Sequence, residues 1–307
     1  MSRIRLNPTD AAPSPVVAAT GLTVAPRGSA SQADLYVTDV APVQRPDAPG
    51  LDARTAQGQL WRRLWLEPER LVAEYVGFAL AEVRDADGAV VFDRVLAPDI
   101  EQHLLLDHLL PLVLARRSFT VLHGAVAHRG GRAVVLLGPT GAGKSTLTAY
   151  AWQQGWTVAG DDGAVLFLGN PPTVQATYPT IRLTPAAARL LDIVPEPGAD
   201  VAGKHRITGA GPAAFCGDAV DLATVVVLRP VGASEPAEMT RLRGAAAHVA
   251  LFSATFHVDF GGGPQLRSVV DELATLAGAV PISVLSVPRG RDGLAAALQA
   301  LEEARRG

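Results

Sequence analysis

The 307-residue sequence predicts an α/β protein in which a core of strands and helices follows a small α+β domain. Short apolar runs at residues 133–137, 223–228 and 282–287 are typical of buried strands. Helical patterns cover residues 266–277 and 293–304. Strands that are mixed with helices in this way form an α/β core, which we expect in the C-terminal part.

Three segments follow one another along the chain. Residues 1–30 are rich in Ala, Pro, Ser and Thr without a periodic pattern, so we expect them to be disordered. Residues 31–118 contain short β-like runs and one helix, residues 99–115, for which Asp99 is the expected N-cap. The expected strands of this small α+β domain are residues 35–37, 59–66, 75–83 and 89–92. Residues 119–307 form the α/β domain.

The composition excludes several classes of protein. A net charge of -3 argues against a nucleic-acid partner bound through bulk electrostatics. The single cysteine, Cys216, excludes an internal disulfide framework and is compatible with the cytosol. No apolar segment is long enough to span a bilayer, and no signal-peptide pattern follows Arg3 and Arg5. We therefore expect a soluble, cytoplasmic protein without a membrane partner.

A glycine-rich motif follows the strand expected at residues 133–137. Residues 138–145 read Gly-Pro-Thr-Gly-Ala-Gly-Lys-Ser and match the phosphate-binding loop (P-loop) pattern G-x-x-x-x-G-K-[ST]. A helix is expected directly after them, so the strand–loop–helix context of the pattern is present. The glycines let backbone N–H groups face a phosphate, and the helix N-terminus adds about half a positive charge. We therefore expect ATP to bind here.

The loop residues have separate expected roles. Lys144 reaches the β- and γ-phosphates, and the Ser145 hydroxyl is a ligand of Mg²⁺. The other expected nucleotide contacts come from Gly138, Pro139, Thr140, Gly141, Ala142, Gly143 and Thr146.

Two adjacent carboxylates, Asp161 and Asp162, follow the strand expected at residues 156–159. Adjacent residues on a regular strand point to opposite faces, so both can serve one site only where the strand has already ended. Gly160 and Gly163 favour such an end. One carboxylate then holds Mg²⁺, directly or through water, and the other accepts a proton from an attacking hydroxyl.

Lysine is rare in this chain. Of the 27 basic residues only two, Lys144 and Lys204, are lysines. A compact ammonium on a flexible stem suits contact with phosphate, so Lys204 is a candidate for contact with phosphate or substrate, together with its neighbour Arg206. A solvated basic loop is the alternative interpretation of this segment.

The order of these motifs resembles the catalytic domain of the HPr kinase/phosphorylase family. It resembles more closely the shorter HPr-kinase-like proteins, some of which phosphorylate serine in peptide precursors. The matching stretches are Leu-His-Gly at residues 122–124, the loop at 138–145 and Gly-Trp-Thr-Val-Ala-Gly-Asp-Asp at 155–162. The resemblance implies a P-loop core of the HPr kinase/PEP carboxykinase-like type. It also implies that Asp161 is the catalytic base, that Asp162 lies at the metal and phosphates, and that His123 lies beside the reacting centre.

The chain departs from the family at two points. A Glu-[Ile/Val]-Arg-Gly-x-Gly segment does not follow the Asp pair, and Thr146 stands where those enzymes carry Glu. Both departures argue against HPr as the substrate and against the phosphorylase back-reaction. Residues 178–183 look like a segment of the shorter relatives. Arg182 within this segment contacts phosphate or substrate, or else lies on the surface at a strand edge.

The sequence therefore predicts an ATP- and Mg²⁺-dependent kinase that transfers the γ-phosphoryl group to a serine hydroxyl of a peptide or protein. A kinase of a small hydroxylated metabolite, a P-loop ATPase and a nucleotide-responsive binding protein are the alternatives. Two carboxylates favour a kinase, because a binding protein needs at most one metal-holding acid. The missing Leu-Ser-Gly-Gly-Gln signature speaks against a transporter ATPase. The resemblance also suggests a homo-oligomer.

Overall fold

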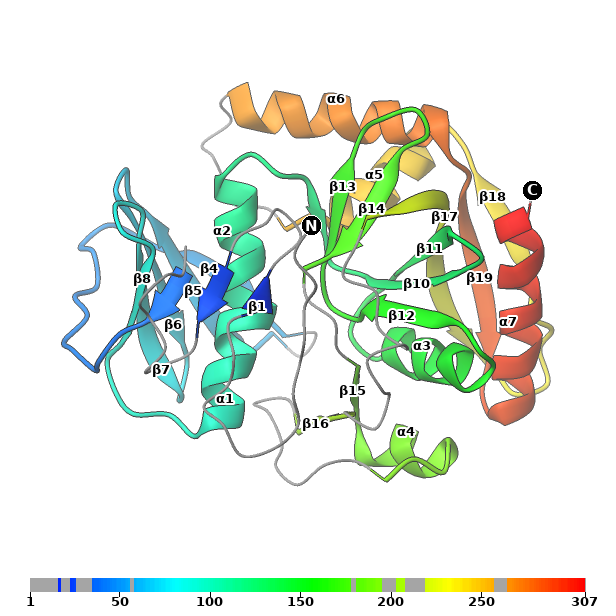
Figure 1. The fold of residues 1–307 in the computed structure, drawn as a ribbon, viewed down its shortest axis with the longest axis horizontal. Coiled ribbons are helices and arrows are strands. Elements are labelled where there is room, and N and C mark those ends of the chain that lie inside the picture. The colour runs from blue at the N-terminus through cyan, green and yellow to red at the C-terminus, as the bar shows by residue number, and fades with distance from the viewer. Residues whose placement is uncertain are drawn as a thin grey trace. The chain divides into compact units, whose positions relative to one another are not determined.

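The computed structural model describes residues 16–17, 23–25, 35–55, 58–177, 181–194, 203–207, 219–256 and 264–306. The chain divides into two compact units, Met1–Leu105 and Leu106–Gly307. Each unit contains one large sheet, so the protein is of mixed α/β class (Figure 1). Of residues 1–30, which the sequence analysis expected to be disordered, only two short strands are among the described residues, and Cys216 lies outside them.

The first unit is built on an eight-stranded sheet in the order β1-β2-β3-β8-β7-β6-β5-β4. Its strands are β1 (Val16–Val17), β2 (Thr23–Ala25), β3 (Leu35–Val37), β4 (Leu51–Arg54), β5 (Leu60–Leu66), β6 (Arg70–Tyr75), β7 (Ala79–Arg84) and β8 (Ala89–Phe92). Strands β4 to β8 pair antiparallel, whereas β3 is parallel to β2 and β8. The single strand expected over residues 75–83 is wrong. Gly77, with φ 83°, turns the chain between β6 and β7 there, a conformation that favours glycine.

One continuous helical segment crosses the boundary between the units. It consists of α1 (Pro98–His103), a π-helical stretch (Leu104–Leu109) and α2 (Leu110–Arg116). The expected N-cap at Asp99 is wrong: Ala97 is the N-cap, and Pro98 occupies the first turn, where its missing N–H has no intrahelical partner to lose. The π-helical stretch contains Asp107, which is buried.

The second unit contains a nine-stranded sheet. Seven strands follow the order β12-β10-β11-β17-β14-β13-β9, while β19 pairs with β17 and β18 pairs with β19. The strands are β9 (Val121–Leu122), β10 (Ala125–Arg129), β11 (Arg132–Leu137), β12 (Thr157–Gly160), β13 (Ala164–Phe167), β14 (Thr173–Ala176), β17 (Val220–Val231), β18 (Met239–Leu242) and β19 (Ile282–Pro288). Strands β11, β17 and β19 run parallel, so their carboxyl ends lie at one edge of the sheet.

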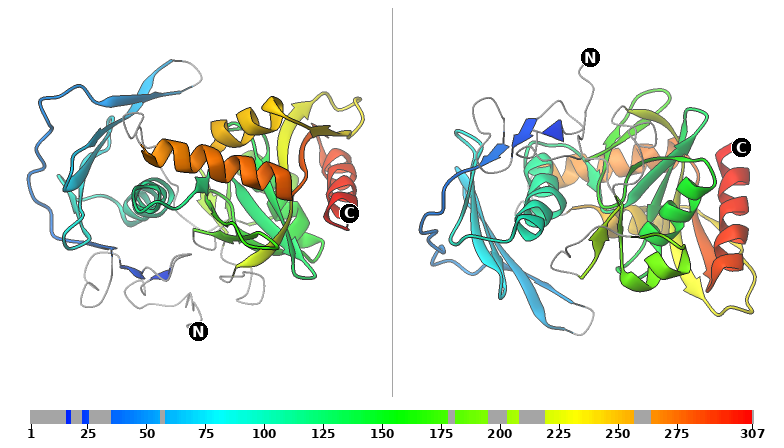
Figure 2. Two further views of the ribbon diagram at one scale, coloured as in Figure 1. Left: turned by 90° about the horizontal axis from the view of Figure 1, so that it is seen from above. Right: turned by 60° about the horizontal axis from the view of Figure 1, so that its bottom comes forward.

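Helices cover both faces of this sheet (Figures 1 and 2). Along β11, Val134 and Leu136 pack in a cluster with residues of α3 and α7, whereas Val135 and Leu137 pack in a cluster with residues of α5 and α6. This alternation follows from the two-residue period of a strand. The helices are α3 (Lys144–Gln153), α4 (Pro185–Leu190), α5 (Ala245–Ala254), α6 (Pro264–Ala279) and α7 (Arg291–Arg306). The helices expected at residues 266–277 and 293–304 are confirmed.

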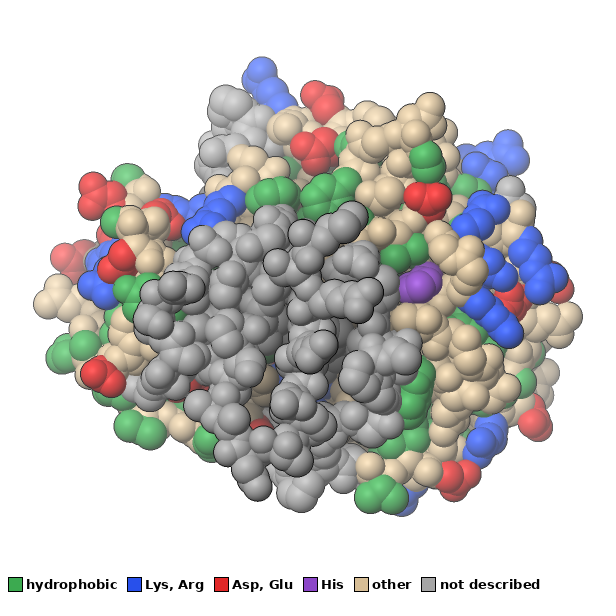
Figure 3. Space-filling model, in the orientation of Figure 1, with side chains coloured by type: hydrophobic (Ala, Val, Ile, Leu, Met, Phe, Trp, Pro, Cys, Tyr) green, Lys and Arg blue, Asp and Glu red, His purple; other side chains and the backbone are tan. Residues whose placement is uncertain are grey.

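The surface arginines near the C-terminus are engaged in ion pairs. Glu302 of α7 pairs with Arg129, Arg305 and Arg306, at N···O distances of 2.8, 2.8 and 3.7 Å. Figure 3 shows basic and acidic side chains intermixed along this side of the molecule. Among the described helices, none is long and apolar enough to cross a membrane.

Candidate active site

The glycine-rich loop connects β11 to α3 at the carboxyl edge of the parallel strands. Gly138, Gly141 and Gly143 have φ angles of 139°, 85° and 96°, which L side chains rarely adopt. At Gly138 space is limiting as well, because a Cβ there would lie 3.1 Å from the carbonyl O of Leu228 on β17. Glycine is therefore required for the loop to curl against the neighbouring strand.

The helix that follows begins with the lysine of the motif. Lys144 is buried, and its Nζ donates to the carbonyl O of Gly138 at 2.6 Å and to that of Pro139 at 3.5 Å. Burial lowers the pKa of Lys144, while the negative charge of Asp162 opposes this shift. Among the described residues no side chain caps α3, and its first turn contains no acidic residue, so the N–H groups of this turn favour an anion. Ser145 and Thr146 lie half-buried in this turn.

The two adjacent carboxylates lie in the bend after β12, which ends at Gly160. The expected strand end before the pair is confirmed, and both Asp161 and Asp162 are buried. The bend continues into Gly163, where a Cβ would lie 2.5 Å from Oγ1 of Thr177. Glycine at this position therefore lets the chain turn closely past its neighbour.

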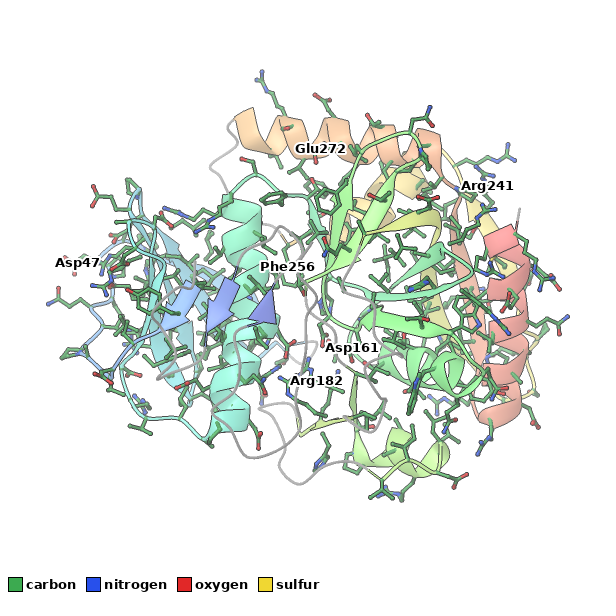
Figure 4. The ribbon with its side chains drawn as sticks, viewed as in Figure 1. Asp47, Asp161, Arg182, Arg241, Phe256 and Glu272 are labelled. Carbon is green, nitrogen blue, oxygen red and sulfur yellow. The ribbon has the colours of Figure 1, made fainter. Side chains whose placement is uncertain are left out.

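Asp161 is fully buried, and its two oxygens differ in their hydrogen bonds. Its Oδ2 accepts a hydrogen bond from the backbone N–H of Arg182 at 2.8 Å (Figure 4). Within the described residues, its Oδ1 makes no hydrogen bond. Burial raises the pKa of Asp161, and the negative charge of Asp162 raises it further, against the opposing charges of Arg182 and Lys204. Unpartnered buried oxygens are uncommon, so this atom is a candidate for contact with a reactant.

The pKa of Asp162 is shifted in the opposite direction. Nε of Arg182 donates to its Oδ2 at 3.2 Å, and Nη2 donates to the same oxygen. Burial opposes ionisation, but the charges of Arg182 and then Lys204 hold the pKa of Asp162 well below its usual range. The bend therefore presents one carboxylate that stays ionised beside one that favours a proton.

Arg182 belongs to a short ribbon that also carries the second lysine. The ribbon consists of β15 (Arg182–Leu183) and β16 (His205–Arg206), with Arg182 opposite Arg206. The surface position considered for Arg182 is wrong, because this residue is 3% exposed. Lys204 directly precedes β16, and its charge contributes to the pKa shifts of His123, Lys144, Asp161 and Asp162. Lys204 therefore interacts electrostatically with Lys144 of the loop and with the Asp pair.

His123 lies in the break between β9 and β10, directly after Leu122. The backbone N–H of His123 donates to the carbonyl O of Ala254 at 2.6 Å. The imidazole ring packs edge-to-face against Phe256, with 5.6 Å between the ring centroids. Burial and the charge of Lys144 lower the pKa of His123 to about 4, so the half-buried ring is neutral near pH 7. It also makes a hydrogen bond with the backbone of Asp162.

The residue after His123 must be small. A Cβ on Gly124 would lie 2.9 Å from the carbonyl O of Leu136 and 2.8 Å from Cδ2 of Leu137. Since the first contact is with backbone, it cannot be relieved by a side-chain rotation. The His-Gly pair of the motif therefore combines a side chain at the site with a close approach to β11.

One residue of the site was missed by the sequence analysis. Oδ2 of Asp107 forms an ion pair with Nη1 of Arg182 at 3.2 Å, and the Asp107 side chain is 1% exposed. It stands among buried leucines of the helix at Leu104, Leu105, Leu106, Leu109 and Leu110. The only sequence signal is an acid within an apolar run, which indicates a buried partner without naming it.

The donors present fit a magnesium ion. Mg²⁺ is usually held by one or two carboxylates together with phosphate oxygens and water. Ser145 and Asp162 supply a hydroxyl and an ionised carboxylate, whose Oδ1 is outside the ion pair with Arg182. Among the described residues, no group of three His, Cys, Asp or Glu side chains is arranged to hold a metal ion.

No family model and no curated protein matches the sequence. Among solved structures, the chain is similar to the HPr(Ser) kinase/phosphatase from Coxiella burnetii, with a TM-score of 0.34 and 11% sequence identity. The match covers 61% of this chain and 99% of that one.

Proposed function

We propose that this protein is an ATP- and Mg²⁺-dependent kinase that transfers the γ-phosphoryl group to a serine hydroxyl of a peptide or protein. The observation that carries the proposal is the electrostatic interaction of Lys144 and Lys204 with the buried pair Asp161 and Asp162. Phosphoryl transfer requires cations for the phosphate oxygens, an acid for the metal and a base for the attacking hydroxyl. The residues of this site include all three kinds of group.

The loop and its lysine bind the nucleotide in this proposal. Backbone N–H groups of residues 140–146 and the ammonium of Lys144 face the β- and γ-phosphates. Ser145 and Asp162 would hold Mg²⁺, which neutralises charge on the phosphate oxygens when it is bound. Lys204 contacts the γ-phosphoryl group while it is transferred. Arg206 contacts the substrate that carries the acceptor hydroxyl.

Asp161 accepts the proton of the serine hydroxyl at its Oδ1 while it is ionised, a form that the charges of Arg182 and Lys204 favour against burial and the charge of Asp162. Its Oδ2 is held by the N–H of Arg182, so Oδ1 is the oxygen available for a reactant. A raised pKa makes a carboxylate a stronger base, and a positioned base contributes about 10²–10⁴-fold to the rate. His123 stays neutral beside the pair, so it adds no charge that would compete with the lysines.

The location of labelled phosphate tests this proposal. The protein is incubated with γ-labelled ATP, Mg²⁺ and a cell lysate, and the label is located on protein, peptide, small molecule or free phosphate. We expect label on serine of a protein or peptide, and none with the Lys144→Ala variant. Label in a small molecule would support the metabolite kinase. Free phosphate alone would support an ATPase, and nucleotide binding without turnover would support a binding protein.

A further inference from the structure

A buried arginine connects the Asp pair to the π-helical stretch Leu104–Leu109. The guanidinium of Arg182 lies between two carboxylates: Nη1 is 3.2 Å from Oδ2 of Asp107, and Nε and Nη2 donate to Oδ2 of Asp162. The side chains of Asp107, Arg182 and Asp162 are 1%, 4% and 9% exposed. Solvent therefore screens none of these contacts effectively.

The contacts of Arg182 are directional. A guanidinium is planar and donates at fixed angles within its plane, so a carboxylate at Nη1 determines where Nε and Nη2 point. Here Asp107 occupies the Nη1 side, and the Nε–Nη2 side faces Asp162. Both bonds on that side end on Oδ2, which leaves Oδ1 of Asp162 outside the pair. A lysine could supply the charge but not this geometry.

Packing alone does not account for Asp107. Its helix neighbours are buried leucines, and a buried ion pair is often no more stabilising than apolar residues of similar volume. Its position in a π-helical stretch is also informative, because π-helical turns are rare and frequently occur at functional sites. Both observations indicate that Asp107 has a role at the Asp pair, to which Arg182 connects it.

We propose that Asp107 and Arg182 are positioning residues: Asp107 fixes the guanidinium plane, and Arg182 holds Asp162 with Oδ1 directed to a divalent cation. The statement about the cation rests on the proposed function, whereas the connection between Asp107 and Asp162 does not. Residues that support a metal ligand typically change metal affinity or activity about 10–100-fold when they are mutated.

The connection is tested on the protein without nucleotide or metal. The arginine Nε–Hε groups are observed by ¹⁵N NMR, and the Arg182 signal is assigned by its loss in Arg182→Lys. Asp107 contacts Nη1, whereas Nε faces Asp162. We expect Asp107→Asn to accelerate hydrogen exchange at Nε–Hε about tenfold or more, the effect of losing one charge-assisted hydrogen bond.

The matched control is Asp192→Asn, which removes the carboxylate of an exposed Asp–Arg pair, 2.7 Å from Arg291. This variant is expected to leave the Arg182 signal unchanged. Exchange at Arg182 Nε–Hε that is equally slow in wild type and in folded Asp107→Asn would overturn the proposal.

The consequence for the cation is measured with Mn²⁺ by electron paramagnetic resonance, in the presence of a non-hydrolysable ATP analogue. We expect Asp107→Asn and Arg182→Lys to weaken Mn²⁺ affinity about 10–100-fold. Affinity for the analogue without metal stays near wild type, which a general loss of structure would not allow. Asp107→Glu, which retains the carboxylate, is expected to recover part of the loss.

The two proposals fail in different ways. If Asp107→Asn does not fold, Arg182→Lys carries the test, and wild-type Mn²⁺ affinity in that variant would overturn the positioning role. If the wild-type protein binds neither Mn²⁺ nor the analogue, the kinase proposal fails. Hydrogen exchange at Arg182 then still decides whether Asp107 acts on Asp162.

Discussion

The Nζ of Lys144 donates a hydrogen bond to the carbonyl O of Gly138 at 2.6 Å. These residues are the first glycine and the lysine of the loop motif, so the loop closes around the ammonium. In the proposed function, a phosphate oxygen that enters the loop would meet a charge already in place and would replace a carbonyl as its partner. Such preorganisation lowers the conformational cost of binding.

Lys144→Ala is therefore expected to weaken ATP binding strongly. The change removes a buried charge that faces the β- and γ-phosphates in the proposed function, and hydrogen bonds between charged groups are about twice as strong as neutral ones. Isothermal titration calorimetry with Mg-ATP measures the effect, and circular dichroism controls for folding. Unchanged affinity in the folded variant would mean that the nucleotide binds elsewhere.

Lys204→Ala is expected to affect transfer more than binding. Its charge acts on both members of the Asp pair, whereas the loop has its own lysine. We expect kcat to fall while the affinity for Mg-ATP changes little. Arg267→Ala, an exposed residue of α6, serves as the control for a general change of surface charge. A wild-type kcat with the true acceptor would exclude Lys204 from the reaction.

Two glycines of the site are expected to tolerate no side chain. In Gly124→Ala and Gly163→Ala the new methyl group would meet atoms at 2.8 Å or less, and overpacking typically costs about 1–3 kcal/mol. Gly278→Ala in α6 is the matched control, because its Cβ meets nothing within 4 Å and helical alanine is favoured by about 0.5–1 kcal/mol. Denaturant unfolding measures all three. Equal stability of the site variants and wild type would contradict the close approaches.

The low pKa of His123 predicts a loss of stability in acid. In the unfolded chain the imidazole takes up a proton near its ordinary pKa of 6.5, whereas in the native protein it stays neutral down to about 4. The native state binds fewer protons in this window, so stability is present above about pH 6.5 and lost as pH falls toward 4. We expect the Tm of wild type to fall more steeply from pH 7 to 4.5 than that of His123→Gln. If the Tm of both proteins falls equally with pH, the pKa of the His123 ring is not lowered in the native state.

Much of the core of the second unit could be predicted from sequence, since β11, β19 and the middle of β17 are largely buried and are continuous apolar runs. The loop and the strand end before Asp161 were predictable because glycine requirements are local. The ribbon of β15 and β16 was not, because two-residue strands carry no periodicity. The burial of Arg182 follows from this ribbon and from the helix that carries Asp107, which is remote in sequence. An acid in a leucine-rich helix does not identify its partner.

The most direct test of the account compares Asp161→Asn with Asp162→Asn in Mg-ATP affinity and single-turnover phosphoryl transfer. The amide in Asp161→Asn keeps the shape of the side chain and leaves Asp162 for the metal. We therefore expect near-wild-type binding and a fall in transfer of at least about two orders of magnitude. Asp162→Asn should instead weaken nucleotide affinity and its dependence on Mg²⁺. Phosphoryl transfer at the wild-type rate by Asp161→Asn would contradict the assignment of Asp161 as the base, which is the central claim of the kinase proposal.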